Sequence, residues 1–103
     1  MNEARLREEL CLTGRTLVEQ GLSGGASGNM SVRLEETVLV TPTGYGLGEL
    51  EPGDLSLVDF DGRHISGPRP TKETFLHLAL YAGRPSAGAV LHTHSTYSVA
   101  VSC

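Results

Sequence analysis

The sequence contains no tryptophan and only two cysteines, and aromatic residues make up 5% of its 103 residues. Basic residues are also scarce: eight Lys and Arg against twelve Asp and Glu give a formal net charge of -4. A nucleic-acid or anionic-membrane surface needs a basic patch, so this balance argues against both partners. Cys11 and Cys103 lie near opposite ends of the chain, and so few cysteines are typical of a reduced, cytoplasmic protein.

Long hydrophobic segments are absent too. No apolar run approaches the ~20 residues that a transmembrane helix needs. The charged first nine residues lack the apolar centre of a secretion signal. We therefore expect a soluble, cytoplasmic protein with a small-molecule partner, built as a single small domain over residues 1–103.

Helical periodicity occurs twice. Apolar residues predict a helix over 3–20 with Gly21 as its stop, and a second helix over 71–81 after Pro70. A third helix is expected to begin at Thr96 or Tyr97. The buried stripe of the second helix is predicted to consist of Phe75, Leu76, Ala79 and Leu80.

Apolar and β-branched runs predict the strands. Residues 30–34 and 38–40 read as one hairpin, and residues 55–60 pair with His64-Ile65 around an Asp61-Gly62 turn. Residues 89–94 read as a buried strand. Hairpins between helices indicate an α/β fold whose sheet is at least partly antiparallel.

The sharpest motif is His92-Thr93-His94 on the last predicted strand. Residues two apart share one strand face, so both imidazoles could bind one Zn²⁺, although two hydrogen-bonded histidines would show the same pattern. Glu73 could be a metal ligand or a general acid/base, or could simply match the dipole of its helix. His77, one turn later, is expected to hydrogen-bond and orient Glu73.

Three loops offer sites for an oxyanion: Gly28-Asn29, Thr43-Gly44 and Thr71-Lys72. No Gly-Lys-Ser/Thr follows the first glycine loop, so none matches a nucleotide-binding fingerprint. Each loop alone reads equally as an ordinary turn. Together, with Lys72 as a point charge, they fit one monophosphate better than a nucleotide.

Four segments resemble the class II aldolase/adducin family, in family order and across nearly the whole chain. They are residues 25–33 (GASGNMSVR), 41–44 (TPTG), 71–73 (TKE) and 89–95 (AVLHTHS). The resemblance implies a three-layer α/β/α fold with a mostly antiparallel central sheet, assembled as a homotetramer.

The resemblance also implies roles for individual residues. His92 and His94 are two of three zinc-binding histidines, and Glu73 is the catalytic acid/base, which can also coordinate the metal. The third histidine is expected beyond Cys103, so the chain is expected to cover about the first half of the family domain. The positions that bind substrate phosphate are Gly28, Asn29, Thr43, Gly44, Thr71 and Lys72.

Thr71-Lys72-Glu73 and Ser95 look most like the 3-oxo-tetronate 4-phosphate decarboxylase subgroup, whereas fuculose-phosphate aldolases typically carry Ser-Ser-Glu. The expected function is therefore a zinc-dependent carbon–carbon lyase acting on a small phosphorylated sugar acid. The alternatives are a fuculose- or ribulose-phosphate type aldolase and a non-catalytic, adducin-like assembly domain. The retained His92, His94 and Glu73 favour an enzyme.

Overall fold

The computed structural model describes residues 2–21, 28–92 and 98–101. Six antiparallel strands form one sheet. The first four strands in the sequence are neighbours in the sheet, and the last two extend it beyond the free edge of the first strand. In chain order the elements are α1 (Glu3–Glu19), β1 (Asn29–Arg33), β2 (Thr37–Val40), the 3-10 turns η1 (Leu47–Glu49) and η2 (Pro52–Asp54), β3 (Ser56–Asp59), β4 (His64–Ser66), α2 (Thr74–Gly83), β5 (Ala89–His92) and β6 (Ser98–Val101). The strand order is β4-β3-β2-β1-β5-β6.

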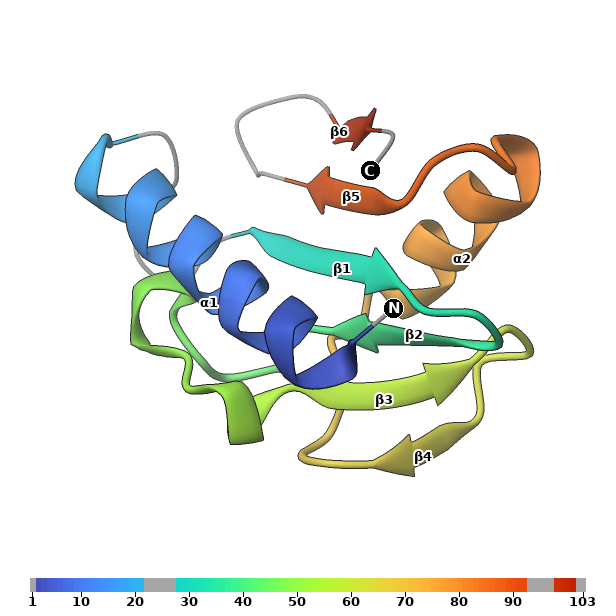
Figure 1. Cartoon of the computed structure of the whole chain (residues 1–103), viewed down its shortest axis with the longest axis horizontal. Coiled ribbons are helices and arrows are strands. Elements are labelled where there is room, and N and C mark those ends of the chain that lie inside the picture. Colours follow the sequence, from blue (N-terminus) through green and yellow to red (C-terminus); the bar gives the residue numbers. More distant parts are fainter. Residues whose placement is uncertain (1, 22–27, 93–97, 102–103) are drawn as a thin grey trace.

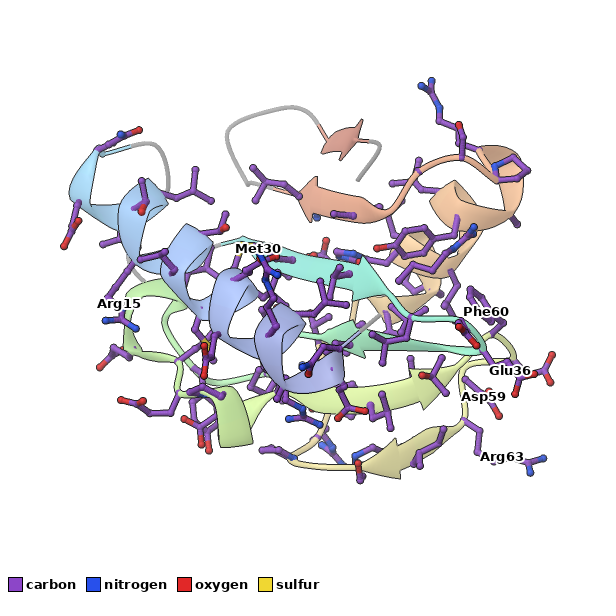
Figure 2. All side chains as sticks on the ribbon, viewed as in Figure 1. Arg15, Met30, Glu36, Asp59, Phe60 and Arg63 are labelled. Carbon is purple, nitrogen blue, oxygen red and sulfur yellow. The ribbon has the colours of Figure 1, made fainter. Side chains whose placement is uncertain are left out.

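One helix covers each face of this sheet, α1 in front and α2 behind in the view of Figure 1. Met30 and Leu39 pack against Leu10 of α1, and Figure 2 shows Met30 between that helix and the sheet. Val40 points to the opposite face, where it packs with Tyr81 of α2. Alternate strand residues point to opposite faces, so the two cores form on the two sides of one sheet. The expected three-layer α/β/α class is confirmed.

Helix α1 has the bounds that its sequence signals predict. The Asn2 side chain accepts a hydrogen bond from the Arg5 N–H at 3.3 Å and so caps the first turn. At the other end, Gly21 adopts a positive φ of 72°, which stops the helix. In the described part of the chain, no helix is both long and apolar enough to cross a membrane.

Gly14 allows α1 to approach the η1 turn closely. A Cβ at position 14 would lie 2.4 Å from the backbone oxygen of Leu47 and 3.0 Å from Cε of Met30. Alanine usually stabilises a helix relative to glycine, but here the backbone must move, so Gly14→Ala should lower the free energy of unfolding by about 2 kcal/mol. Urea unfolding measures this change. Gly83→Ala, with no atom within 4 Å, is the control, and equal stability of the two variants would contradict this packing.

The two predicted hairpins are confirmed. In β1–β2, Ser31 lies opposite Val40. In β3–β4, the turn has Gly62 at a φ of 89°, and the Asp59 carboxylate accepts hydrogen bonds from the N–H groups of Asp61 and Arg63, both at 2.9 Å. Asp59 and Arg63 mark this turn in Figure 2.

Helix α2 corrects the predicted buried stripe. It runs from Thr74 to Gly83, and its fully buried residues are His77 and Tyr81, while Phe75 is 73% exposed. Of the predicted stripe, Phe75 and Ala79 are exposed, Leu76 is partly buried, and Leu80 packs against the core. The fully buried positions are polar because the strand opposite supplies a hydroxyl, Ser31, to which His77 and Tyr81 hydrogen-bond.

The predicted third helix is also wrong over residues 98–101. These residues form β6, which pairs antiparallel with β5, Ser98 opposite His92. A short apolar run with two valines is compatible with either structure, and the open edge of β5 offers backbone partners to a strand. Thr96 and Tyr97 lie outside the described residues.

Candidate active site

Strands β1, β2 and β5 bring several of the predicted site residues to one end of the sheet. Strand β1 begins where its antiparallel neighbours β2 and β5 end, as Figure 1 shows. Asn29 at the start of β1 is therefore the direct cross-strand partner of His92 at the end of β5. The loop that follows β2 leaves the sheet at the same end.

Backbone hydrogen bonds join the loop after β2 to the segment that precedes α2. The Thr43 N–H donates to the Arg69 carbonyl, and the Thr71 N–H donates to the Thr41 carbonyl, both at 3.0 Å. The Thr41 hydroxyl in turn accepts from the Met30 N–H at 3.1 Å, which ties this loop to β1. The two loops therefore form one rigid wall beside the start of β1.

A pocket of about 200 Å³ lies between these segments. Gly28 and Gly44 have φ values of 93° and 85°, which residues with a Cβ rarely adopt. The nine lining residues include all six predicted phosphate positions: Gly28, Asn29, Pro42, Thr43, Gly44, Tyr45, Thr71, Lys72 and Glu73. Residues that are ordinary turn residues when taken singly are thus collected around one small polar space.

The start of α2 differs from its prediction in a way that affects the pocket. Glu73 is the N-cap residue and Thr74 the first helical residue, so Thr71 and Lys72 lie in the turn before the helix. The Thr71 hydroxyl accepts from the Glu73 N–H at 3.3 Å, and its carbonyl accepts from the Thr74 hydroxyl at 2.6 Å. The predicted phosphate positions therefore belong to a hydrogen-bonded turn that leads into α2.

Glu73 also connects the pocket to strand β5. Its carboxylate Oε2 pairs with Nδ1 of His92, and both side chains are partly buried. This contact fits the metal-ligand role predicted for Glu73, because a carboxylate beside a histidine can share a metal with it. It also allows a role that was not predicted, the orientation of the His92 ring. His94 lies outside the described residues.

The donor types at this position suit a divalent metal. Imidazole and carboxylate are both zinc ligands, and the two described groups already touch. Within residues 2–21, 28–92 and 98–101, no three His, Cys, Asp or Glu side chains are grouped as a metal site. A metal held by His92 and Glu73 would thus need at least one further ligand from elsewhere.

His77 has partners other than the one predicted. Its Nδ1 lies 2.7 Å from the Ser31 hydroxyl, and its Nε2 bonds Oδ1 of Asn29. Both ring nitrogens are therefore engaged with β1, and the expectation that the ring orients Glu73 is corrected. Burial lowers the pKa of His77 from 6.5 to about 4, helped by His92 and opposed by Glu73. The ring is neutral at pH 7.

Two members of this buried network, Ser31 and Tyr81, were not predicted from the sequence. The Tyr81 hydroxyl lies 2.7 Å from the Ser31 hydroxyl, and both residues are at most 1% exposed. The Arg33 guanidinium stacks over the Tyr81 ring at 4.9 Å and donates to the Tyr81 carbonyl at 3.1 Å. A signal was present in the spacing, because Ser31 and Arg33 share the strand face of Asn29, and Tyr81 shares the helix face of His77.

This fold and site define a class of protein. The sequence model of the Class II Aldolase and Adducin N-terminal domain matches residues 8–103. The chain belongs to this family.

Two curated relatives of this chain are enzymes with known names. The chain is 43% identical over 104 residues to the 3-oxo-tetronate 4-phosphate decarboxylase of Haemophilus influenzae, covering 100% of this chain and 50% of that protein. It is 35% identical over 102 residues to the L-fuculose phosphate aldolase of Escherichia coli K12, covering 99% of this chain and 47% of the aldolase. The chain thus spans about half the length of the curated relatives it matches.

Solved structures agree with the sequence comparison. YgbL from Klebsiella pneumoniae, described as an aldolase, epimerase or decarboxylase, superposes with a TM-score of 0.88 at 43% identity. The match covers 94% of this chain and 47% of YgbL. An L-fuculose 1-phosphate aldolase superposes with a TM-score of 0.80 at 34% identity. The architecture is therefore common to YgbL and to an aldolase.

Proposed function

We propose that this chain contributes the phosphate pocket, the acid/base and part of the metal centre of a carbon–carbon lyase that decarboxylates a 3-oxo-tetronate 4-phosphate. One observation carries the proposal: a pocket of about 200 Å³ collects Gly28-Asn29, Thr43-Gly44 and Thr71-Lys72 around one space, with Glu73 on its wall. Glu73 in turn touches His92. An anion site and an acid/base are thereby adjacent.

The chemistry of the pocket favours a monophosphate. Its hydroxyl, amide and ammonium groups are suitable donors to phosphate oxygens. Lys72, the single lysine of the chain, supplies the positive charge. With the phosphate held there, the reacting end of a four-carbon acid would extend toward Glu73 and His92.

The reaction breaks one carbon–carbon bond and then needs one proton. A divalent metal bound by His92, Glu73 and further ligands would polarise the ketone next to the breaking bond. When CO₂ leaves, the electron pair of the broken bond remains on the substrate and is finally taken up as a C–H bond. Glu73 is placed to hold and deliver that proton, which is general acid catalysis by a positioned side chain.

An aldolase is the second candidate, because the same arrangement would serve when the leaving group is an aldehyde. Its support is the 35% identity to L-fuculose phosphate aldolase, against 43% to the decarboxylase. A non-catalytic, adducin-like domain is less well supported, because it would have no use for the contact of Glu73 with His92. We further propose zinc as the metal, the cytoplasm as the location and a homotetramer as the assembly.

A chimera tests the proposed reaction. Residues 1–103 would replace the matching half of the Haemophilus influenzae decarboxylase, with which they share 43% identity. We expect this chimeric enzyme to release CO₂ from 3-oxo-tetronate 4-phosphate and to leave L-fuculose 1-phosphate intact. Cleavage of the second substrate alone would favour the aldolase.

The phosphate pocket is tested by Lys72→Ala in the same chimeric enzyme. Removing one charged donor should raise KM for the phosphorylated substrate about tenfold and change kcat much less, because the contact is made before and during the reaction alike. Arg63→Ala removes an equal charge from the exposed β3–β4 turn and should leave KM unchanged. Equal use of phosphorylated and unphosphorylated substrate by the unmutated enzyme would contradict the pocket.

A further inference from the structure

A chain of buried hydrogen bonds runs from α2 to the wall of the pocket. It joins the Tyr81 hydroxyl to Ser31 Oγ, Ser31 Oγ to His77 Nδ1, and His77 Nε2 to Asn29 Oδ1. All four residues are at most 4% exposed. Asn29 alone among them also lines the pocket, so the network ends at the proposed anion site.

The proton positions along this chain depend on one another. A neutral imidazole carries one N–H and one acceptor nitrogen. If Nε2 carries the proton, it donates to Asn29 Oδ1, and Nδ1 accepts the Ser31 proton. The Ser31 oxygen then accepts from Tyr81. If Nδ1 carried the proton, Nε2 would be an acceptor and would require the Asn29 amide to turn its NH₂ group inward.

The structure places Oδ1 of Asn29 at Nε2 of His77, which agrees with the first arrangement. Since the amide oxygen is engaged inside the protein, the amide NH₂ is the end of the side chain left for the pocket. An NH₂ group donates to an anion, whereas an amide oxygen in its place would repel one.

We propose that His77 is a positioning residue for the pocket: with Nδ1 accepting from Ser31, its Nε2–H donates to Oδ1 of Asn29 and holds the Asn29 amide so that its NH₂ group faces the ligand. The ligand class is a phosphate or a similar oxyanion. This inference rests on the proposed phosphate pocket. It assigns His77 no contact with substrate or metal.

The tautomer can be measured directly in the 103-residue chain. Long-range ¹H–¹⁵N correlation spectra at pH 7 should show a protonated Nε2 and an unprotonated Nδ1 for His77. The side-chain NH₂ signal of Asn29 should shift when inorganic phosphate is titrated in. A protonated Nδ1 overturns the inference, and this measurement requires no substitution in the buried network.

Two variants then separate positioning from simple structural support. His77→Leu removes the donor to Asn29 and should weaken phosphate binding about tenfold, as expected for a misplaced donor to an anion. His77→Gln can place an amide N–H where Nε2 was, so it should retain affinity within about twofold. His64→Leu, at an exposed position on β4, is the control and should bind like the unmutated chain.

A double-mutant cycle completes the test. If His77 acts through Asn29, His77→Leu should weaken phosphate binding no further once Asn29→Ala is present. Additive losses, or full affinity in a folded His77→Leu chain, would overturn the inference. Loss of affinity in His77→Gln equal to that in His77→Leu would also count against it. Failure of the proposed function looks different: the Nε2–H tautomer would be present, but phosphate would shift no signal in the unmutated chain.

Discussion

Glu73→Gln is expected to lower kcat of the chimeric enzyme by at least about 10²-fold, as for the loss of a positioned acid/base. Glutamine keeps the shape of the side chain and can still hydrogen-bond to His92, but it cannot deliver a proton. The fold should persist, because the substituted carboxylate lies at the N-cap of α2 and makes no side-chain capping bond there. Steady-state kinetics with the phosphorylated acid, together with a thermal unfolding curve, measures both properties.

The matched control for this substitution is Glu36→Gln. Glu36 is an exposed carboxylate in the turn between β1 and β2, and its side chain is marked in Figure 2. The control variant should retain full turnover. Near-normal kcat in Glu73→Gln would remove Glu73 from the proton transfer and leave it only the role of orienting His92.

The second large effect concerns stability at low pH. His77 is neutral in the folded chain, with a pKa lowered to about 4 by burial and, to a smaller extent, by His92. In the unfolded chain its pKa returns to the ordinary 6.5. Between these values only the unfolded state binds the proton, so acidification favours unfolding. The stability contribution is complete above pH 6.5 and should fall by about 3 kcal/mol as the pH reaches 4.

Urea unfolding at several pH values tests this expectation, with His77→Gln as the reference. Glutamine does not titrate, while the carboxylates that ionise near pH 4 are common to both proteins. The difference between the two stability curves therefore isolates the histidine. A difference that stays constant from pH 7 to pH 4 would mean that the ring takes up its proton equally in both states.

The strands of the two hairpins were predictable because their limits are local. Asp61-Gly62 allows a tight turn with a positive φ, and alternating apolar residues on each side place the strands. The buried face of α2 was not predictable in this way. His77 and Tyr81 are buried because Ser31, 46 and 50 positions away in the sequence, supplies their hydrogen bonds. A helix pattern contains no information about the polarity of the strand it will cover.

The site could be predicted as a set of residues but not as a structure. Each pocket loop reads alone as an ordinary turn. The shared chemistry of Asn29, Thr43 and Lys72 suggested one monophosphate site, and the resemblance to a family implied the same role for them. Their grouping depends on backbone bonds such as that from Thr71 to Thr41, which pairs two segments that have no complementary sequence signal. The side-chain bond between Asn29 and His77 is equally unpredictable, since it joins the first strand to the second helix.

The position of β5 beside β1 has a consequence for the order in which the molecule assembles. The β1–β2 and β3–β4 pairs close short loops, whereas Asn29 and His92 are partners about sixty positions apart. Closing so long a loop loses more chain entropy, so the β1–β5 pairing is expected to form after the hairpins. The Glu73–His92 pair then exists only once β5 has paired with β1. A ligand that contacts both β1 and β5 would stabilise this pairing. It would slow unfolding and leave the rate of hairpin formation unchanged.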